Sequence, residues 1–148
     1  MAKKILNIFI SQPMHGRSEE EIVKERKEIM QLLGECNPYK KTWDLHIIDN
    51  LHHENVKTWD YFPPERAGRL WNLGQSISKI ADADLIVFVC GWDKAAGCNV
   101  EWIVSNSYEI PYIFSISDDF EFVKQTIRRA MQEKNKWRYK NGKEKKNN

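Results

Sequence analysis

Short apolar runs alternate along the chain with segments in which apolar residues recur every three or four positions. The run DLIVFVCG at residues 84–91 is the clearest predicted strand, because an unbroken apolar run is typical of a parallel strand buried on both faces. Residues 70–80 carry leucine or isoleucine at positions 70, 73, 77 and 80, which predicts an amphipathic helix. The same reasoning predicts strands at 5–10, 45–49 and 111–116, and helices at 18–34, at 97–108 and from 118 or 119 to about 133.

This alternation of strands and helices predicts one α/β domain, built on a parallel sheet of four to five strands with helices on both faces. A length of 148 residues is ordinary for a single domain. Ser18 followed by Glu19, Glu20 and Glu21 is a capping pattern that marks the start of the first helix. We expect the domain to span residues 1–133. The long connection at residues 50–64 is of a kind that is often functional.

The basic charge of the chain is concentrated at its end. From Lys124 onward the sequence holds ten Lys or Arg and two Glu, a charge of +8, so that the remainder carries −6 of the net +2. Residues 134–148 are therefore predicted to form a flexible basic tail that solubilises the protein. The alternative is contact with nucleic acid, for which Trp137 and Tyr139 offer stacking surfaces. We expect any role in nucleic-acid binding to be confined to this tail.

The metal-ligating residue types are sparse. Three cysteines without a CxxC pair favour a reduced, cytoplasmic protein and argue against a zinc site. The adjacent His52 and His53 are better interpreted as a solvated loop pair than as metal ligands. No apolar run is long enough to span a membrane, and no metal or organic cofactor is implied.

The chemistry of the chain should lie where the predicted strands end, since ligands of open parallel sheets bind outside the carboxyl ends of the strands. The motifs GxGxxG, GK[ST] and HExxH are absent, which argues against a nicotinamide dehydrogenase or a P-loop NTPase. The candidate residues at the predicted strand ends are Ser11, Gln12, Met14, His15, Gly16 and Arg17 after the first strand, Asp49 after the second, and Gly91, Trp92, Asp93, Gly97 and Glu101 after the third.

Glu101 is the most informative of these residues. It falls in the first turn of the helix that follows Gly97, where the helix dipole and free amides favour an ionised carboxylate. Such a carboxylate is a plausible nucleophile. The alternative is a capping glutamate, although the residue three positions earlier is Cys98 and not the Ser or Thr of a capping box.

The first loop and Trp92 each leave two interpretations open. The hydroxyl of Ser11, the amides of the loop and the guanidinium of Arg17 are suited to a phosphate or a sugar. An ordinary strand-to-helix turn with a solvated arginine is equally compatible with the sequence. Trp92 is either exposed for stacking on a base or packed within the fold.

Two segments, IFISQPMHGR and LWNLGQSISKIADADLIVFVCGWDKAAGCNVEW, resemble the nucleoside 2-deoxyribosyltransferase-like superfamily. The resemblance is to a branch with an ISxPMxG opening and a GWxxxxGCxxE motif, and it covers about residues 5–116. It implies a Rossmann-like or flavodoxin-like sheet and a homodimer with the site near the subunit interface. It also implies cleavage or exchange of the N-glycosidic bond of nucleosides or their 5′-monophosphates, with Glu101 as the nucleophile and residues 11–17 as sugar or phosphate ligands.

Three positions depart from the pattern of that superfamily. Gln75 or Ser76 stands where transferase members carry an aspartate, Phe9 replaces a common tyrosine, and Ala95 replaces an aspartate six residues before the nucleophile. These changes leave open which acid assists the departing base, with Asp93 and Asp49 as candidates.

The expected function is that of an N-glycosidase or pentosyltransferase acting on a nucleoside or nucleotide. The alternative is a nucleotide-binding module, such as a sensor or sequestering protein, that uses the same pocket without turnover. The resemblance and the six tryptophans predict a homodimer, with Trp59, Trp71 and Trp102 as candidate interface residues.

Overall fold

The structure, a computed structural model, describes residues 2–49, 64–115 and 118–146. The side chains of 64, 65, 67 and 137–146 lie outside this description. The histidine pair at 52 and 53, Trp59 and nearly all of the long connection at 50–64 also lie outside the described residues.

Four strands form one sheet in the order β2–β1–β3–β4, and every neighbouring pair is parallel. This confirms the predicted parallel α/β fold, and the order is that of flavodoxin-like sheets. Strand β2 lies on one side of β1, and β3 and β4 lie on the other, so the strand order reverses between β1 and β3. At this point Ser11 pairs in register with Phe88. The strands are β1 (Lys4–Ser11), β2 (Trp43–Ile47), β3 (Leu85–Phe88) and β4 (Tyr112–Phe114).

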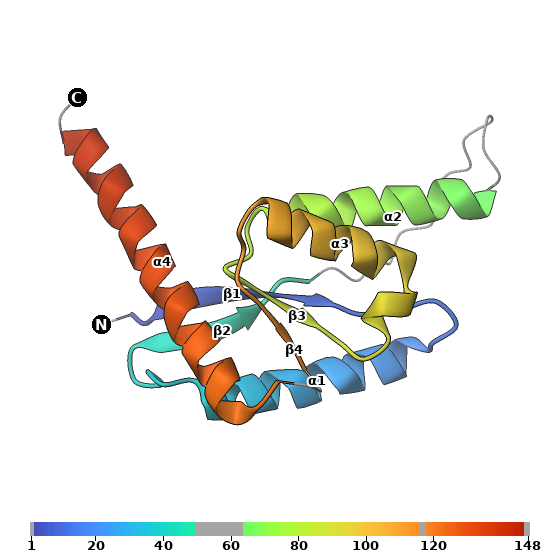
Figure 1. Ribbon diagram of the computed structural model, residues 1–148, viewed down its shortest axis with the longest axis horizontal. Helices are drawn as coiled ribbons and strands as arrows, with labels where there is room; N and C mark the ends of the chain where they lie inside the picture. The colour runs from blue at the N-terminus through green and yellow to red at the C-terminus, as the bar shows by residue number, and fades with distance from the viewer. Residues whose placement is uncertain (1, 50–63, 116–117, 147–148) are drawn as a thin grey trace.

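Helices cover both faces of the sheet, as predicted. One core joins α1 and α4 to the sheet, and a second, rich in aromatic residues, joins α2 and α3 to its other face. Figure 1 shows α2 and α3 above the sheet and α1 below it. The helices are α1 (Glu19–Cys36), α2 (Pro64–Ile80), α3 (Ala96–Ser107) and α4 (Phe120–Lys146), with a short 3-10 helix, η1 (Trp92–Lys94), before α3.

The predicted start of α1 is confirmed, because the Ser18 side chain accepts a 3.2 Å hydrogen bond from the backbone N–H of Glu21. The helix runs to Cys36 and not to position 34, because Asn37 provides its cap. Strand β2 lies two residues earlier than predicted, since the 5% exposed Trp43 belongs to the core.

The apolar stripe predicted on α2 is only partly turned inward. Ile80 is 1% exposed, whereas Leu70 is 58% exposed. Leu73 of this stripe packs against Gly97 of α3. A β-carbon added at Gly97 would lie 3.8 Å from Cδ1 of Leu73. The helix thus divides its apolar residues between the sheet, α3 and solvent.

Helix α4 does not end near residue 133 as predicted, because it continues to Lys146. The basic segment is therefore helical as far as Lys146. Its composition is compatible with this, since Lys, Arg and Glu are good helix formers and the segment contains no Pro. The Lys134 ammonium group donates 2.6 Å hydrogen bonds to the Asp84 carboxylate and to the carbonyl of Ile5, so α4 is tied to the sheet at this position.

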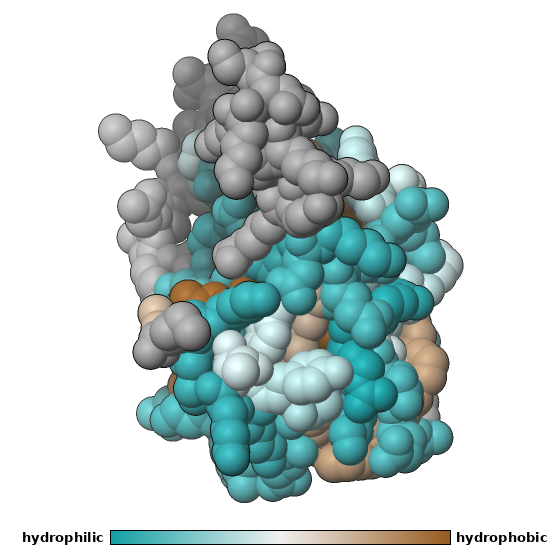
Figure 2. Space-filling view, turned by 90° about the vertical axis from the view of Figure 1, so that its left-hand side faces the viewer, coloured by the Kyte–Doolittle hydropathy of each residue, from teal (hydrophilic) through white to brown (hydrophobic). Residues whose placement is uncertain are grey.

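At the amino ends of the strands, polar and charged side chains from the sheet and from α4 bond to one another. Lys134 and Asp84 meet there, and the Lys4 ammonium group donates to the Asn135 side chain at 3.1 Å. Figure 2 faces this end of the molecule, and the residues coloured in it are mainly hydrophilic. The charged groups at this edge therefore make contacts that tie α4 to the sheet.

Candidate active site

The carboxyl ends of β1 and β3 meet where the strand order reverses, which is the place at which doubly wound sheets bind ligands. The chain leaves β1 at Ser11, and the backbone N–H of Val89 donates to the Ser11 carbonyl at 3.0 Å. Gly91 then turns the chain toward η1 with a φ of +85°, a left-handed conformation that favours glycine. Helix α3 follows and brings Glu101 back to the end of β1.

Glu101 and Ser11 form the centre of this site. The Ser11 hydroxyl donates a hydrogen bond of 2.5 Å to Oε2 of Glu101, although the two residues are 90 positions apart in the chain. Ser11 is fully buried and Glu101 is 7% exposed. A short bond from a hydroxyl to a carboxylate is among the stronger hydrogen bonds of proteins. Ser11 is therefore a positioning residue for Glu101, a role that its interpretation as a sugar or phosphate ligand did not include.

Burial controls the ionisation of Glu101. Loss of solvation raises the pKa of Glu101 to about 7, while the Ser11 hydrogen bond and the positive charge of Arg26 oppose this rise. The carboxylate is thus poised between its two protonation states near neutral pH. Carboxyl groups with such raised pKa values cluster at functional sites, where they serve as acids, bases or nucleophiles.

Arg26 is a site residue that the sequence analysis did not identify. It is 6% exposed, on the inner face of α1, and its Nε donates a 2.8 Å hydrogen bond to the Gln12 side-chain oxygen. Burial lowers the pKa of the Arg26 guanidinium, and the carboxylates of Asp49 and Glu101 oppose that effect. The available signal was its position four residues after Ile22 and three before Ile29, on an otherwise apolar stripe.

Cys98 lies beside the same pair of residues. It is 4% exposed, and burial raises the pKa of the Cys98 thiol to about 11, with the Glu101 carboxylate adding to the rise and the Ser11 hydrogen bond opposing it. A protonated thiol is a poor nucleophile. Glu101 is therefore the stronger nucleophile candidate of the two.

Two of the predicted first-loop ligands bond to α1. The Gln12 amide nitrogen donates to the Glu25 carboxylate at 2.6 Å and to the Ile22 carbonyl at 3.2 Å. The Arg17 guanidinium donates to the same Glu25 carboxylate at 2.8 Å and to the carbonyl of Pro13 at 3.2 Å. These bonds hold the loop on α1, and the partly exposed Arg17 side chain is paired with Glu25.

The tip of the first loop is a tight turn. The backbone N–H of Arg17 donates to the Met14 carbonyl at 3.2 Å, and Gly16 has a φ of +75°. This turn exposes His15. The imidazole of His15 lies against Arg69 of α2, whose Nη2 is 3.2 Å from Nδ1 and 3.3 Å from Nε2. Arg69 was missed by sequence reasoning, which attached no chemistry to the beginning of α2.

Trp92 packs within the fold and is not a free stacking surface. Its ring lies 5.3 Å from those of Phe88 and Phe114 and 5.8 Å from that of Trp102, measured between centroids. The half-buried side chain belongs to the aromatic core beneath α3. It thereby anchors the segment that leads from β3 to Glu101.

The remaining predicted residues are placed around this centre. Asp93 is exposed on η1, and its carbonyl accepts a 3.0 Å bond from the Asn99 side chain. Asp49 follows β2, within electrostatic range of Arg26. Ser76 is buried on α2, and Gly97 packs against that helix from α3. In the portion of the chain that the structure describes, no group of three or more His, Cys, Asp or Glu residues is arranged to hold a metal ion.

Replacing Ser11 with alanine is expected to raise the pKa of Glu101 further, because the carboxylate loses the hydrogen bond that favours its charged form. Hydrogen bonds to charged groups are worth about 1.5–3 kcal/mol, which corresponds to about a ten- to hundred-fold weaker ionisation. A pH titration of the Glu101 carboxyl by carbon-detected NMR measures this change. Ser105→Ala is the matched control, since Ser105 is also fully buried and bonds instead to the Trp102 carbonyl. Equal titration of Glu101 in both variants would contradict the assigned role of Ser11.

Among the described residues, no helix is long and apolar enough to cross a membrane. Comparison with models of protein families, with curated proteins and with solved structures found no match for this chain.

Proposed function

We propose that the protein cleaves the N-glycosidic bond of a nucleoside or nucleotide, with Glu101 as the nucleophile. The observation that carries the proposal is a buried carboxylate, held by the Ser11 hydroxyl, at the ligand-binding edge of a parallel sheet. The resemblance of the two segments around Ser11 and Glu101 to nucleoside 2-deoxyribosyltransferase-like proteins supports the same reaction class. No metal or organic cofactor is needed for this chemistry.

The proposed reaction has two steps. An oxygen of ionised Glu101 attacks the anomeric carbon, the carbon–nitrogen bond breaks, and its electron pair leaves with the base, which takes up a proton. Asp93 or Asp49 is the candidate donor of that proton, directly or through water. Water, or a second base, then attacks the anomeric carbon of the glycosyl-enzyme, gives its proton to the aspartate that protonated the departing base, and releases the Glu101 carboxylate.

The raised pKa of Glu101 is compatible with the first step of this cycle. Near neutral pH an appreciable fraction of the carboxyl groups is ionised and able to attack. A poorly solvated carboxylate is also more nucleophilic than one stabilised by water. The Ser11 hydroxyl holds Oε2 of Glu101, so the other carboxylate oxygen, Oε1, is the candidate attacking atom.

The test is incubation of the protein with a panel of nucleosides and nucleoside 5′-monophosphates, followed by chromatography for free base. Release of a base from one panel member is the expected result. Binding of a panel member without any release of base would favour the second candidate, a nucleotide-binding module. That alternative is supported by two positions at which the transferases of the resembled superfamily carry an aspartate: one is Gln75 or Ser76 here, and the other is Ala95.

We also propose that the protein forms a homodimer through the outer surfaces of α2 and α3. Trp71 on α2 is 44% exposed and Ile103 on α3 is 57% exposed, and large apolar side chains are enriched at such interfaces. Light scattering at tens of micromolar is expected to give the mass of a dimer, and Trp71→Glu to give that of a monomer. A monomeric wild type would refute this proposal without affecting the role of Glu101.

A further inference from the structure

The side-chain amide of Gln12 has one orientation that satisfies its neighbours. Gln12 is 4% exposed, directly after β1, and its nitrogen donates to the Glu25 carboxylate at 2.6 Å and to the Ile22 carbonyl at 3.2 Å. A carboxylate and a carbonyl only accept, so the amide nitrogen must face them and the amide oxygen must face away. That oxygen accepts the 2.8 Å bond from Nε of Arg26. Gln12 therefore holds the Arg26 guanidinium in a defined place.

Gln12 holds this guanidinium without cancelling its charge, because an amide is neutral. The negative charge of Glu25 is matched by Arg17, whose Nη1 lies 2.8 Å from the Glu25 carboxylate. The positive charge of Arg26 acts on the carboxylates of Asp49 and Glu101. Arg26 is 6% exposed and Glu101 is 7% exposed, so water and salt screen their attraction less than that of a surface pair.

Adjacent residues at the end of β1 hold the two charged groups. Ser11 bonds Glu101 of α3, and Gln12, the next residue, bonds Arg26 of α1. Helices α1 and α3 cover opposite faces of the sheet, and successive residues of an extended chain point to opposite faces. One short segment thus fixes the carboxylate from one side and the guanidinium from the other.

The other titratable groups near Glu101 come from its own helix and from the end of β2. Burial raises the pKa of the Cys98 thiol to about 11, so this neighbour on α3 carries no charge at neutral pH. Asp49, after β2, acts on Arg26 and shares the influence of its charge with Glu101. Burial raises the pKa of Glu101, and the charge that opposes this effect is that of Arg26.

We propose that Gln12 and Arg26 are positioning residues for the nucleophile: Gln12 holds the guanidinium of Arg26 in place, and its positive charge keeps Glu101 ionised. This inference rests on the proposed role of Glu101. It also changes the assignment of Gln12, which the sequence placed among the ligands of the substrate. A carboxyl group attacks only in its ionised form, so a fixed positive charge nearby increases the fraction of molecules that are ready to react.

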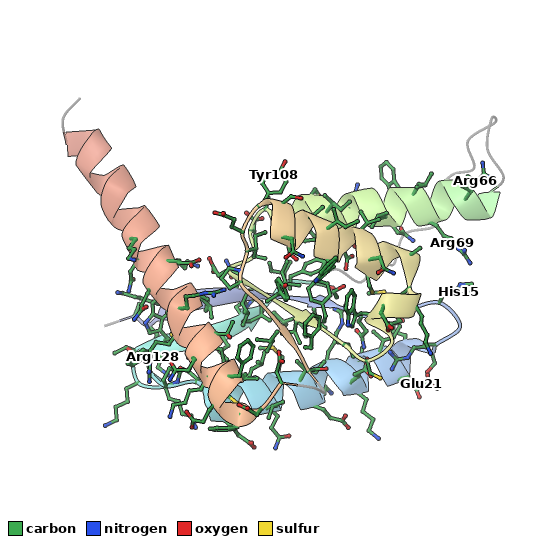
Figure 3. The ribbon with its side chains drawn as sticks, in the orientation of Figure 1. His15, Glu21, Arg66, Arg69, Tyr108 and Arg128 are labelled. Carbon is green, nitrogen blue, oxygen red and sulfur yellow. The ribbon has the colours of Figure 1, made fainter. Side chains whose placement is uncertain are left out.

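The first test is a pH titration of the Glu101 carboxyl by carbon-detected NMR in the wild type, Arg26→Gln and Arg128→Gln. Arg26→Gln is expected to make Glu101 about ten-fold harder to ionise, because a nearby opposite charge has at least about this effect. Arg128→Gln is the control and should titrate as the wild type does. Arg128 lies on α4 against the Tyr39 ring, and Figure 3 shows it at the opposite end of the molecule from His15 and the first loop. Equal titration in all three proteins would overturn the inference.

Gln12→Met tests the role of Gln12 separately, and it keeps the inference testable if loss of the buried arginine prevents folding. Methionine has nearly the same shape but cannot accept the bond from Arg26. We expect Glu101 to become harder to ionise, by a smaller factor than in Arg26→Gln, because the guanidinium keeps its charge but loses its support. The combined variant should titrate as Arg26→Gln does, since Gln12 acts through Arg26. An unchanged titration in Gln12→Met, or a further shift in the combined variant, would refute this role.

The pH profile of base release separates this inference from the proposed function. In Arg26→Gln, the pH of half-maximal release should move upward, while the rate at high pH approaches that of the wild type. A rate lowered by the same factor at every pH would refute the inference. The NMR titration needs no substrate, so a shifted Glu101 in Arg26→Gln supports the inference even when no panel member releases its base. Base release together with an unshifted Glu101 refutes it and leaves the glycosidase proposal intact.

Discussion

Replacing Glu101 with glutamine is expected to abolish release of the base while leaving ligand binding in place. The amide is close in size to the carboxylate and can still accept the Ser11 hydrogen bond, but it lacks the negative charge needed to form a glycosyl-enzyme. Loss of a nucleophile lowers turnover by at least about a thousand-fold in well-studied enzymes. The released base is measured by chromatography, and binding by calorimetry on the same preparation.

Glu28→Gln provides the control for this experiment. Glu28 is exposed on α1, so the same chemical change there should leave turnover at the level of the wild type. Turnover that survives in Glu101→Gln would sink the proposed mechanism. Loss of binding together with turnover would indicate that Glu101 supports the site structurally.

The free energy of unfolding of the wild type should fall by about 3 kcal/mol, through Glu101 alone, as the pH rises from about 4.5 to about 7. The pKa of Glu101 is about 7 in the folded chain, against an ordinary value of 4.5. Below pH 4.5 both states are protonated and no stability is lost. Between the two pKa values the unfolded chain gives up its proton and the folded chain retains it, so the folded state is progressively disfavoured. Above the folded pKa the loss is complete.

Urea denaturation of the wild type and of Glu101→Gln across this pH range isolates the contribution of Glu101. The variant lacks the titrating group. The free energy of unfolding of the variant minus that of the wild type should therefore increase by about 3 kcal/mol between pH about 4.5 and about 7. The sequence placed Glu101 in the first turn of the helix after Gly97, where the helix dipole alone would contribute only about 0.3–1 kcal/mol. Helix α3 instead begins at Ala96, so Glu101 lies in its second turn, on the buried face of the helix, and is only 7% exposed. A difference between the two proteins that is constant with pH would show that Glu101 titrates as an ordinary carboxyl.

The order of the elements was predictable because it depends on local patterns. The unbroken apolar run around β3 marks a strand covered on both faces, and Ser18 with the glutamates after it marks the start of α1. Such patterns depend only on residues that are close together in the sequence, so they can be recognised without the rest of the chain. The same locality explains the misplaced end of α4, since the basic composition that suggested a flexible tail is equally compatible with a helix.

The partners of the site residues depended on the tertiary structure. Position along the chain singled out Glu101, but its bond to Ser11 exists because β1 and β3 pair in register and α3 returns over their ends. Gln12 and Arg17 carry groups suited to a ligand, yet the packing of the first loop on α1 directs both to Glu25. Arg69 meets His15 only because α2 crosses the same edge of the sheet. Hydrogen bonds and burial act across space, so residues far apart in the chain determine the charge and the partners of each candidate group.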